Sequence, residues 1–180
     1  YNRVNAAVPF DQARNSVIAS QVAVNEYRRA VIHLPGTSGL NIRVGSNAVI
    51  NTNGRIIGGT TAGVYYGTAP APSATSLTRI TGTPAAAVAP ASPGYNDSYE
   101  AVFGMSYAQL RAMATVVVTN MSAFPSPLPQ NGLVIIDTGG PVTIGPPKPL
   151  IGNAILIVKG NLTMNDGNNA NFNGMLYVEG

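Results

Sequence analysis

Residues 152–180 read GNAILIVKGNLTMNDGNNANFNGMLYVEG, and this stretch contains a strand-like segment that returns twenty residues later. The repeated positions are the pairs Leu156 and Leu176, Val158 and Val178, and Gly160 and Gly180. At the same offset, VTI at 142–144 is matched by LTM at 162–164. A period of twenty residues is typical of repeat proteins whose coils stack on one another. The repeat therefore predicts a β-solenoid.

Stacking also predicts which side chains are neighbours. Adjacent coils lie about 4.8 Å apart, so residues at equivalent positions form ladders. We expect these ladders to join Leu156 to Leu176, Val158 to Val178 and Lys159 to Glu179. The aliphatic pairs would face the core, and the two charges would lie together on the outer face, where such a pair contributes roughly 0.2–1 kcal/mol. The alternative is a β-sandwich with coincidentally similar strands, which antiparallel pairing of the two segments would favour.

The first 35 residues predict a long amphipathic helix. Pro9 precedes an apolar pattern with spacings of three and four residues, and Pro35-Gly36 ends it. The packing stripe that we expect consists of Phe10, Ala13, Val17, Val24 and Val31. A stripe of this kind can be buried along one face of a helix. We interpret residues 1–35 as the lower part of a longer helix that rests on the β domain.

Residues 36–180 form the predicted β-solenoid-like domain, in which short β runs alternate with Gly, Asn and Pro. Residues 68–94 are rich in Ala, Pro, Ser and Thr and predict an exposed loop, in which one strand near Leu77 to Ile80 is the regular element that we consider. Residues 97–115 predict a short helical insertion, whose second helix opens with a capping-box pattern from Ser106 to Gln109. The predicted fold class is mainly β, with one long N-terminal helix and a β-solenoid domain.

The composition is low in charge and contains no cysteine. Charged residues make up 9% of the chain, against roughly 25% in an average soluble domain. The net charge is only +3, and no basic cluster interleaves with aromatic residues, so nucleic-acid binding is not favoured. Without cysteine, a disulfide framework and cysteine metal sites are excluded. No signal peptide is visible and the chain starts at Tyr1, so we expect a mature or trimmed fragment.

The sequence offers little to build a catalytic site. Its seven Asp and Glu residues are dispersed, and His33 is the only histidine, which excludes a zinc site and a Cys–His couple. Asp137 and Asp166 are the one pair of carboxylates that strand packing could bring together, and NDGNN at 165–169 is better explained as a turn than as a calcium loop. No phosphate loop, dinucleotide fingerprint or nucleophile elbow is present. We therefore predict no catalytic residue, cofactor or metal.

Three segments together resemble a known family. SYEAVFGMSYAQLRAMA at 98–114, GLVIID at 132–137 and the closing stretch from 152 are similar to PilX-type, prepilin-like accessory proteins of bacterial type IV pili. The resemblance covers residues 98–180 well and the first helix more loosely, because Val22-Ala23-Val24-Asn25 stands where such helices often carry Ala-Glu-Ala-Gly. It implies a pilin-type helix joined to a β-solenoid-like domain, and it implies no catalytic residues.

The function expected from these features is that of a non-enzymatic cell-surface component. The resemblance implies a minor pilin or pilin-like accessory protein, located in the cell envelope or outside the cell. Its expected partners are other pilin-like subunits or a pilus assembly complex, and a surface ligand is a further candidate. A membrane would be reached only through an upstream helix. Two alternatives stay open, an ice-binding or other adhesin solenoid and a carbohydrate-active β-helix enzyme. The first has only Thr143 and Thr163 as a threonine ladder, and the second has few acids.

Overall fold

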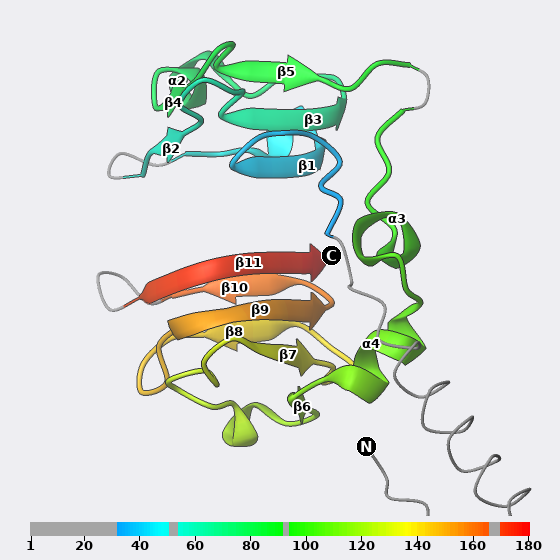
Figure 1. Ribbon diagram of the computed structural model, residues 1–180. Coiled ribbons are helices and arrows are strands. Elements are labelled where there is room, and N and C mark those ends of the chain that lie inside the picture. Colours follow the sequence, from blue (N-terminus) through cyan, green and yellow to red (C-terminus); the bar gives the residue numbers. More distant parts are fainter. Residues whose placement is uncertain (1–31, 51–53, 92–93, 166–169) are drawn as a thin grey trace, which may run out of the picture. The chain divides into compact units, whose positions relative to one another are not determined.

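The computed structural model describes residues 32–50, 54–91, 94–165 and 170–180. The chain divides into two compact units, Tyr1–Gly104 and Met105–Gly180 (Figure 1). All strand pairs in the described part of the chain are parallel, apart from one isolated antiparallel bridge between Gly145 and Lys148. The two units therefore share one style of strand pairing, although each has its own sheets and core.

The second unit contains a four-stranded sheet in the order β11–β9–β7–β6 and a two-stranded sheet of β10 and β8. The strands are β6 (Val116–Val118), β7 (Gly132–Ile136), β8 (Val142–Ile144), β9 (Ile151–Lys159), β10 (Leu162–Met164) and β11 (Asn171–Glu179). Helix α4 (Tyr107–Met113) precedes them, and the 3-10 turn η2 (Met121–Ala123) follows β6. Valine, isoleucine and leucine dominate β6 and β7, and all residues of β7 except Leu133 are buried, as expected for a strand covered on both faces.

The pairing of β9 with β11 has the twenty-residue register that the repeat predicts. Leu156 lies opposite Leu176, and Lys159 lies opposite Glu179. The same offset joins β8 to β10. The earlier strands are spaced differently, because Val116 pairs with Val134 after 18 residues and Val134 pairs with Leu156 after 22. A repeat of fixed length is consequently visible in the sequence only over the last strands.

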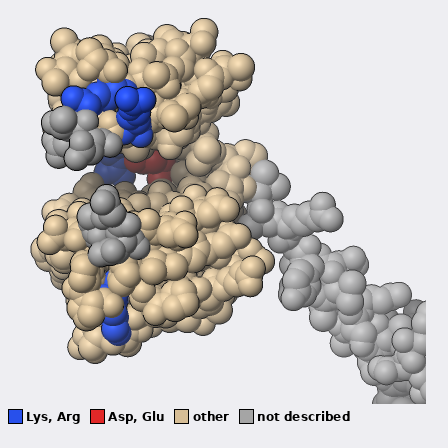
Figure 2. Space-filling model, turned by 90° about the vertical axis from the view of Figure 1, so that its left-hand side faces the viewer, with Lys and Arg blue, Asp and Glu red and all other residues tan. Residues whose placement is uncertain are grey.

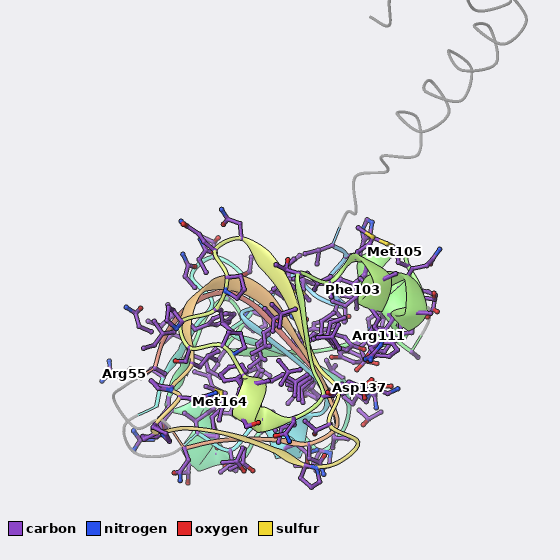
Figure 3. The ribbon with its side chains drawn as sticks, turned by 90° about the horizontal axis from the view of Figure 1, so that it is seen from below. Arg55, Phe103, Met105, Arg111, Asp137 and Met164 are labelled. Atoms are coloured by element: carbon purple, nitrogen blue, oxygen red, sulfur yellow. The ribbon has the colours of Figure 1, made fainter. Side chains whose placement is uncertain are left out.

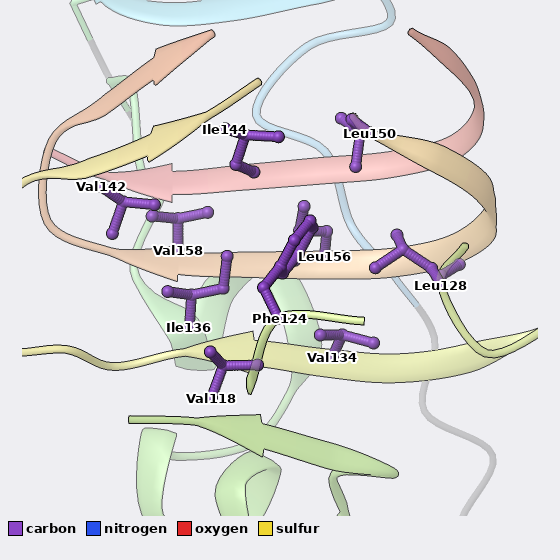
Figure 4. Close-up of a cluster of buried hydrophobic side chains, with 11 residues drawn as sticks. Val118, Phe124, Leu128, Val134, Ile136, Val142, Ile144, Leu150, Leu156 and Val158 are labelled. Atoms are coloured by element: carbon purple, nitrogen blue, oxygen red, sulfur yellow. The ribbon is translucent and has the colours of Figure 1, made fainter. Parts of the chain in front are cut away.

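The core of the second unit lies on one face of the four-stranded sheet (Figure 4). Alternate residues of each strand point into it, so that Val134 and Ile136 of β7 are followed by Leu156 and Val158 of β9. The remaining buried members are Val118, Phe124, Leu128, Val142, Ile144, Leu150 and Ala154. The intervening residues Ile135 and Ile157 are also fully buried, so β7 and β9 are covered on both faces.

The first unit contains a three-stranded sheet in the order β1–β3–β5 and a two-stranded sheet of β2 and β4. The elements are β1 (Leu40–Val44), η1 (Gly45–Asn47), β2 (Ile56–Ile57), β3 (Val64–Thr68), α2 (Ala74–Leu77), β4 (Ile80–Thr81), β5 (Ala86–Val88) and α3 (Tyr99–Phe103). Its core is smaller and centres on Ala48, Val64 and Ile80. Leu40 and Ile42 of β1 pack against this core while remaining partly exposed.

Helices α3 and α4 lie within the predicted helical insertion 97–115. Ser98 caps α3 through its side chain, and Gly104 ends it with a φ of 66°, a left-handed conformation that costs glycine little. Ser106 and Gln109 form the predicted capping box at the start of α4. The two short helices expected within 97–115 are therefore confirmed.

The predicted fold class is wrong. The helices in the described residues are short, with four, five and seven residues in α2, α3 and α4. The strands are divided among four small parallel sheets in two units, so a single β-solenoid over 36–180 does not describe the chain. The repeat specifies how β9 pairs with β11, but the unequal strand spacings elsewhere and the separate core of the first unit show that it cannot be extended to the whole domain.

The long N-terminal helix falls mainly outside the described residues, and so do Phe10, Ala13, Val17, Val24 and Val31 of its expected stripe. The described end of that segment is not helical, because residues 32–34 have no regular structure. There the backbone N–H of His33 donates a hydrogen bond to the carbonyl of Val102 in α3, with an N···O distance of 2.7 Å. Tertiary contact thus replaces the helical hydrogen bond that the apolar pattern predicts at this position.

Residues 68–94 were expected to form an exposed loop, but they contain α2, β4 and β5. Ser73 caps α2, and Ser76 and Ile80 are almost completely buried. The backbone N–H of Ile50 donates to the hydroxyl of Ser76, which ties this segment to the loop after η1. The segment lacks a long apolar period because its strands are only two or three residues long, so the pattern indicated one strand near 77–80 and gave no sign of β5.

Candidate functional site

The most organised polar group of the second unit lies where the parallel strands β7, β9 and β11 end. Lys159 is opposite Glu179, and the pairing of Ile136 with Val158 places Asp137 beside Lys159 at the next position. Neighbouring strands therefore present Asp137, Lys159 and Glu179 in a row, with charges that alternate in sign. Opposite charges on adjacent strands stabilise a sheet, whereas like charges destabilise it. We call these three residues the charge column.

Two side chains of helix α4 contact the charge column. Tyr107 and Arg111 are four residues apart and so lie on the same face of the helix. The Tyr107 hydroxyl donates a hydrogen bond of 2.6 Å to Oδ2 of Asp137, and Nη1 of Arg111 donates one of 2.9 Å to the same oxygen. Figure 3 shows Arg111 and Asp137 on the same side of the unit. The carboxylate of Asp137 thus fixes α4 at the end of β7.

Lys159 contacts the ring of Tyr107. Its Nζ lies 4.4 Å from the centroid of the Tyr107 ring, within the range of a cation–π interaction. At a partly exposed site such a contact contributes about 0.5–1 kcal/mol. Tyr107 therefore touches two members of the charge column at once, Asp137 through its hydroxyl and Lys159 through its ring.

The environment of Tyr107 favours its neutral phenol. Burial raises the pKa of Tyr107 above its ordinary value, the hydrogen bond to Asp137 raises it further, and the bond from Arg111 acts in the opposite direction. The phenol is consequently a hydrogen-bond donor at neutral pH. An activated nucleophile or base needs a lowered phenol pKa, so the direction of the shift favours a structural role for Tyr107.

The two carboxylates of the charge column do not have the geometry of a hydrolase pair. Asp137 and Glu179 are two strand spacings apart, a backbone separation of about 9.6 Å. Inverting glycosidases use carboxylates at a comparable separation, but they keep the space between them open for a water molecule. Here Lys159 occupies the strand between them. The arrangement suits charge neutralisation between strands better than acid–base catalysis.

No group of three or more His, Cys, Asp or Glu residues that could hold a metal ion occurs within the described ranges. The approach of Asp137 to Asp166 is not tested, because Asp166 lies outside those ranges. In the first unit, Nε of Arg43 lies 2.8 Å from Oδ2 of Asp97 in a partly exposed ion pair. Most of the face drawn in Figure 2 carries neither acidic nor basic groups, in keeping with the low charge of the sequence.

The second notable feature is the exposure of two apolar side chains on β11. Leu176 and Val178 continue the columns of core residues formed by Leu156 and Val158, but 36% and 39% of their surfaces are exposed. Leu156 and Val158 are fully buried. β11 is the last strand of its sheet and pairs with β9 on one side, within the part of the chain that the structure describes. Its apolar side chains are thus the incompletely covered end of the core.

Sequence reasoning identified Lys159 and Glu179 as neighbours but missed Tyr107 and Arg111. Their spacing of four residues on a predicted helix was a usable signal for two side chains on one face. It could not indicate Asp137 as their partner. Asp137 lies 26 positions after Arg111 and 30 positions after Tyr107, so both contacts depend on how the chain folds.

Comparison with known proteins does not name a relative. No family model matches the chain, and neither the curated proteins nor the solved structures give a significant match. Within the described ranges, no helix has both the length and the apolar character that a membrane crossing requires.

Proposed function

We propose that this protein is a non-enzymatic structural or assembly component of the bacterial cell surface, a minor pilin or pilin-like accessory protein of a type IV pilus or related filament. The observation that carries the proposal is the edge of β11, where core-facing Leu176 and Val178 remain more than one-third exposed. Incompletely covered apolar strands are typical of proteins whose function is to bind a neighbour.

The charged groups support an assembly role over catalysis. Asp137 is engaged by Tyr107 and Arg111, and Asp97 is engaged by Arg43. These interactions hold helices and loops against strands, and in the part of the chain that the structure describes they engage both of these carboxylates. The resemblance of residues 98–114 and 132–180 to PilX-type proteins points in the same direction. Its partners would be other pilin-like subunits or a pilus assembly complex, at the cell envelope or outside the cell.

The alternatives receive less support from the geometry. Thr143 and Thr163 are register partners in the short strands β8 and β10, so the threonine ladder has two members. An ice-binding surface needs a longer regular array, and absence of thermal hysteresis would exclude it. A carbohydrate-active enzyme needs accessible carboxylates, whereas Asp137 accepts two hydrogen bonds from side chains of α4.

The proposal is tested in the bacterium that encodes the chain. Surface filaments would be sheared from the cells, purified and probed with an antibody raised against this protein. We expect the protein in the filament fraction, and we expect deletion of its gene to reduce the number of surface filaments. A protein that is absent from that fraction, in cells whose filament number is unchanged by the deletion, would contradict the proposal.

A further inference from the structure

The sequence contains three copies of the motif Asn-X-Ser/Thr, in which X is not proline. They are Asn96-Asp97-Ser98, Asn120-Met121-Ser122 and Asn161-Leu162-Thr163. The motif marks asparagines that can receive an N-linked glycan. Because two of its three positions carry all the information, it also recurs by chance, and the surroundings of each copy must distinguish a usable acceptor from a coincidence.

The middle copy directly follows β6 and includes the start of the 3-10 turn η2. Its central residue, Met121, packs against the core of the second unit and is partly buried. The residues on either side, Asn120 and Ser122, are both exposed. The core therefore anchors this copy through Met121, while the two side chains that define the motif are presented to solvent.

A hydrogen bond fixes the orientation of the Asn120 amide. The backbone N–H of Ser122 donates to Oδ1 of Asn120 over 2.9 Å, which makes Asn120 the N-cap of η2. Since an N–H can only donate, the oxygen of the amide must occupy this position, and the nitrogen points away from the turn. Among the described residues, no hydrogen bond engages Nδ2 of Asn120 or the hydroxyl of Ser122. A sugar on Nδ2 would leave the cap intact, because the capping atom is Oδ1.

The first copy has its hydroxyl committed to the fold. The Ser98 hydroxyl accepts a hydrogen bond from the backbone N–H of Ala101 and so caps α3. The motif requires a hydroxyl two positions after the asparagine, so a transferase must contact that hydroxyl. In this copy the contact would compete with the helix cap, whose loss typically costs about 1 kcal/mol.

The third copy has its backbone committed to a sheet. Thr163 lies in β10 opposite Thr143 of β8, and the carbonyl of Asn161 accepts a hydrogen bond from the backbone N–H of Val142. A transferase that binds the backbone of this copy would have to separate it from β8. The structure thus presents the middle copy as the accessible acceptor.

We propose that Asn120 is an N-glycosylation site and that it is the one of the three motifs that carries a glycan. The donor is an oligosaccharide joined through diphosphate to a polyprenol lipid. Nδ2 of Asn120 forms a bond to C1 of the first sugar, and the bond between C1 and the diphosphate oxygen breaks. The lipid diphosphate leaves with the electron pair, and the proton from Nδ2 passes to a base of the transferase. The inference rests on the proposed function for location alone, because this transfer acts on exported chains.

Peptide mass spectrometry of the protein purified from the cells that encode it tests the site. We expect the peptide that contains Asn120 to be heavier than its sequence by whole sugar residues, and fragmentation to place the sugars on that side chain. The peptides that contain Asn96 and Asn161 should have the masses of their sequences, and they serve as internal controls. Asn120→Gln should abolish the glycan, whereas Asn96→Gln and Asn161→Gln should retain it.

The hydroxyl of Ser122 provides a second test. Ser122→Ala removes the hydroxyl but keeps Asn120 and the backbone N–H that bonds to it. We expect this variant to lose the glycan and Ser122→Thr to keep it, because the motif accepts either hydroxyl. Retention by Ser122→Thr, with equal melting temperatures of the two variants after removal of any sugar, would separate recognition of the motif from misfolding. A glycan that persists in Ser122→Ala would contradict the proposal.

The outcomes separate this inference from the proposed function. A bare Asn120, or sugars on Asn96 or Asn161 in its place, would overturn the assignment. If that bare protein were present in the sheared filament fraction, the proposed function would still stand. A glycan on Asn120 of a protein that is absent from the filament fraction, in cells whose filament number does not depend on it, would support the modification and overturn the function.

Discussion

β9 and β11 are neighbouring strands with nearly the same inner sequence and with very different surroundings. Leu156 and Val158 of β9 are fully buried between β7 and β11, whereas Leu176 and Val178 of β11 are 36% and 39% exposed. The side chains, the register and the parallel direction are shared. Burial is thus determined by the number of neighbouring strands and not by the local pattern, so equal residues in a repeat have unequal energetic roles.

The largest effect that we expect distinguishes the two leucines. Leu156→Ala removes a fully buried side chain from the centre of the core and should cost about 2–5 kcal/mol of the free energy of unfolding. Leu176→Ala should cost about 1 kcal/mol, because part of that side chain is already in water and no closed cavity results. Chemical denaturation of the two variants measures both values, and equal losses would show that β11 is covered in solution.

A glycine in β11 gives the next largest effect. Gly174 has a φ of 152°, and a Cβ at this position would overlap the carbonyl oxygen of Ala154 in β9. Gly174→Ala should therefore cost about 1–3 kcal/mol, the usual range for a residue forced into an unfavourable backbone conformation. The matched control is Gly139→Ala, which also has a positive φ but has nothing within 4 Å of the added Cβ. If the two variants unfold at the same temperature, the close approach of β11 to β9 is not significant.

This comparison also explains how much of the structure the sequence could predict. The repeat correctly indicates that Leu156 lies opposite Leu176 in parallel strands, because two strands of equal pattern and spacing specify one register. It does not predict the four separate sheets or the two units, because strands of two or three residues leave no period to detect. The predicted β-solenoid applied the pairing of β9 with β11 to the whole of residues 36–180, and the separate sheets of the structure show that this prediction is wrong.

The sequence predicted only part of the candidate site. Lys159 and Glu179 follow from the repeat, since they occupy the same position in successive strands. Tyr107 and Arg111 do not, because their bonds to Asp137 depend on where α4 lies relative to the end of β7. The local pattern predicted the capping box of α4, because such a cap is satisfied by residues only three positions apart in the chain.

The hydrogen bond from Tyr107 to Asp137 should contribute about 1 kcal/mol to the free energy of unfolding at neutral pH, the usual contribution of such a bond. Tyr107→Phe keeps the ring beneath Lys159 and removes only the hydroxyl. The folded protein raises the pKa of Tyr107, so the unfolded chain loses the phenol proton first as the pH rises. The stabilisation is therefore complete below about pH 10, the ordinary tyrosine pKa, and decreases as the pH passes through the higher folded value.

Thermal unfolding of the natural protein and of Tyr107→Phe between neutral and strongly alkaline pH measures this dependence. The other tyrosines ionise in both proteins, so the difference between the two curves isolates Tyr107. We expect the difference in melting temperature to become smaller as the pH rises above about 10. A difference that is constant over the whole range would mean that the hydroxyl is not bonded to Asp137 in solution.

The smallest effect that we expect comes from the charge column at the ends of β9 and β11. Lys159→Glu replaces the central cation by an anion and should cost below about 1 kcal/mol, because Lys159 is exposed and exposed ion pairs contribute little. Lys159→Gln removes the charge without adding repulsion and separates the lost attraction from the new like-charge contacts with Asp137 and Glu179. The cost of Lys159→Glu should exceed that of Lys159→Gln in low salt, and the two should converge in high salt, where exposed charges are screened.

Equilibrium unfolding at two salt concentrations provides the measurement. A large, salt-independent loss would show that Lys159 acts chiefly through its contact with the Tyr107 ring, and that α4, not the neighbouring strand, is its principal partner.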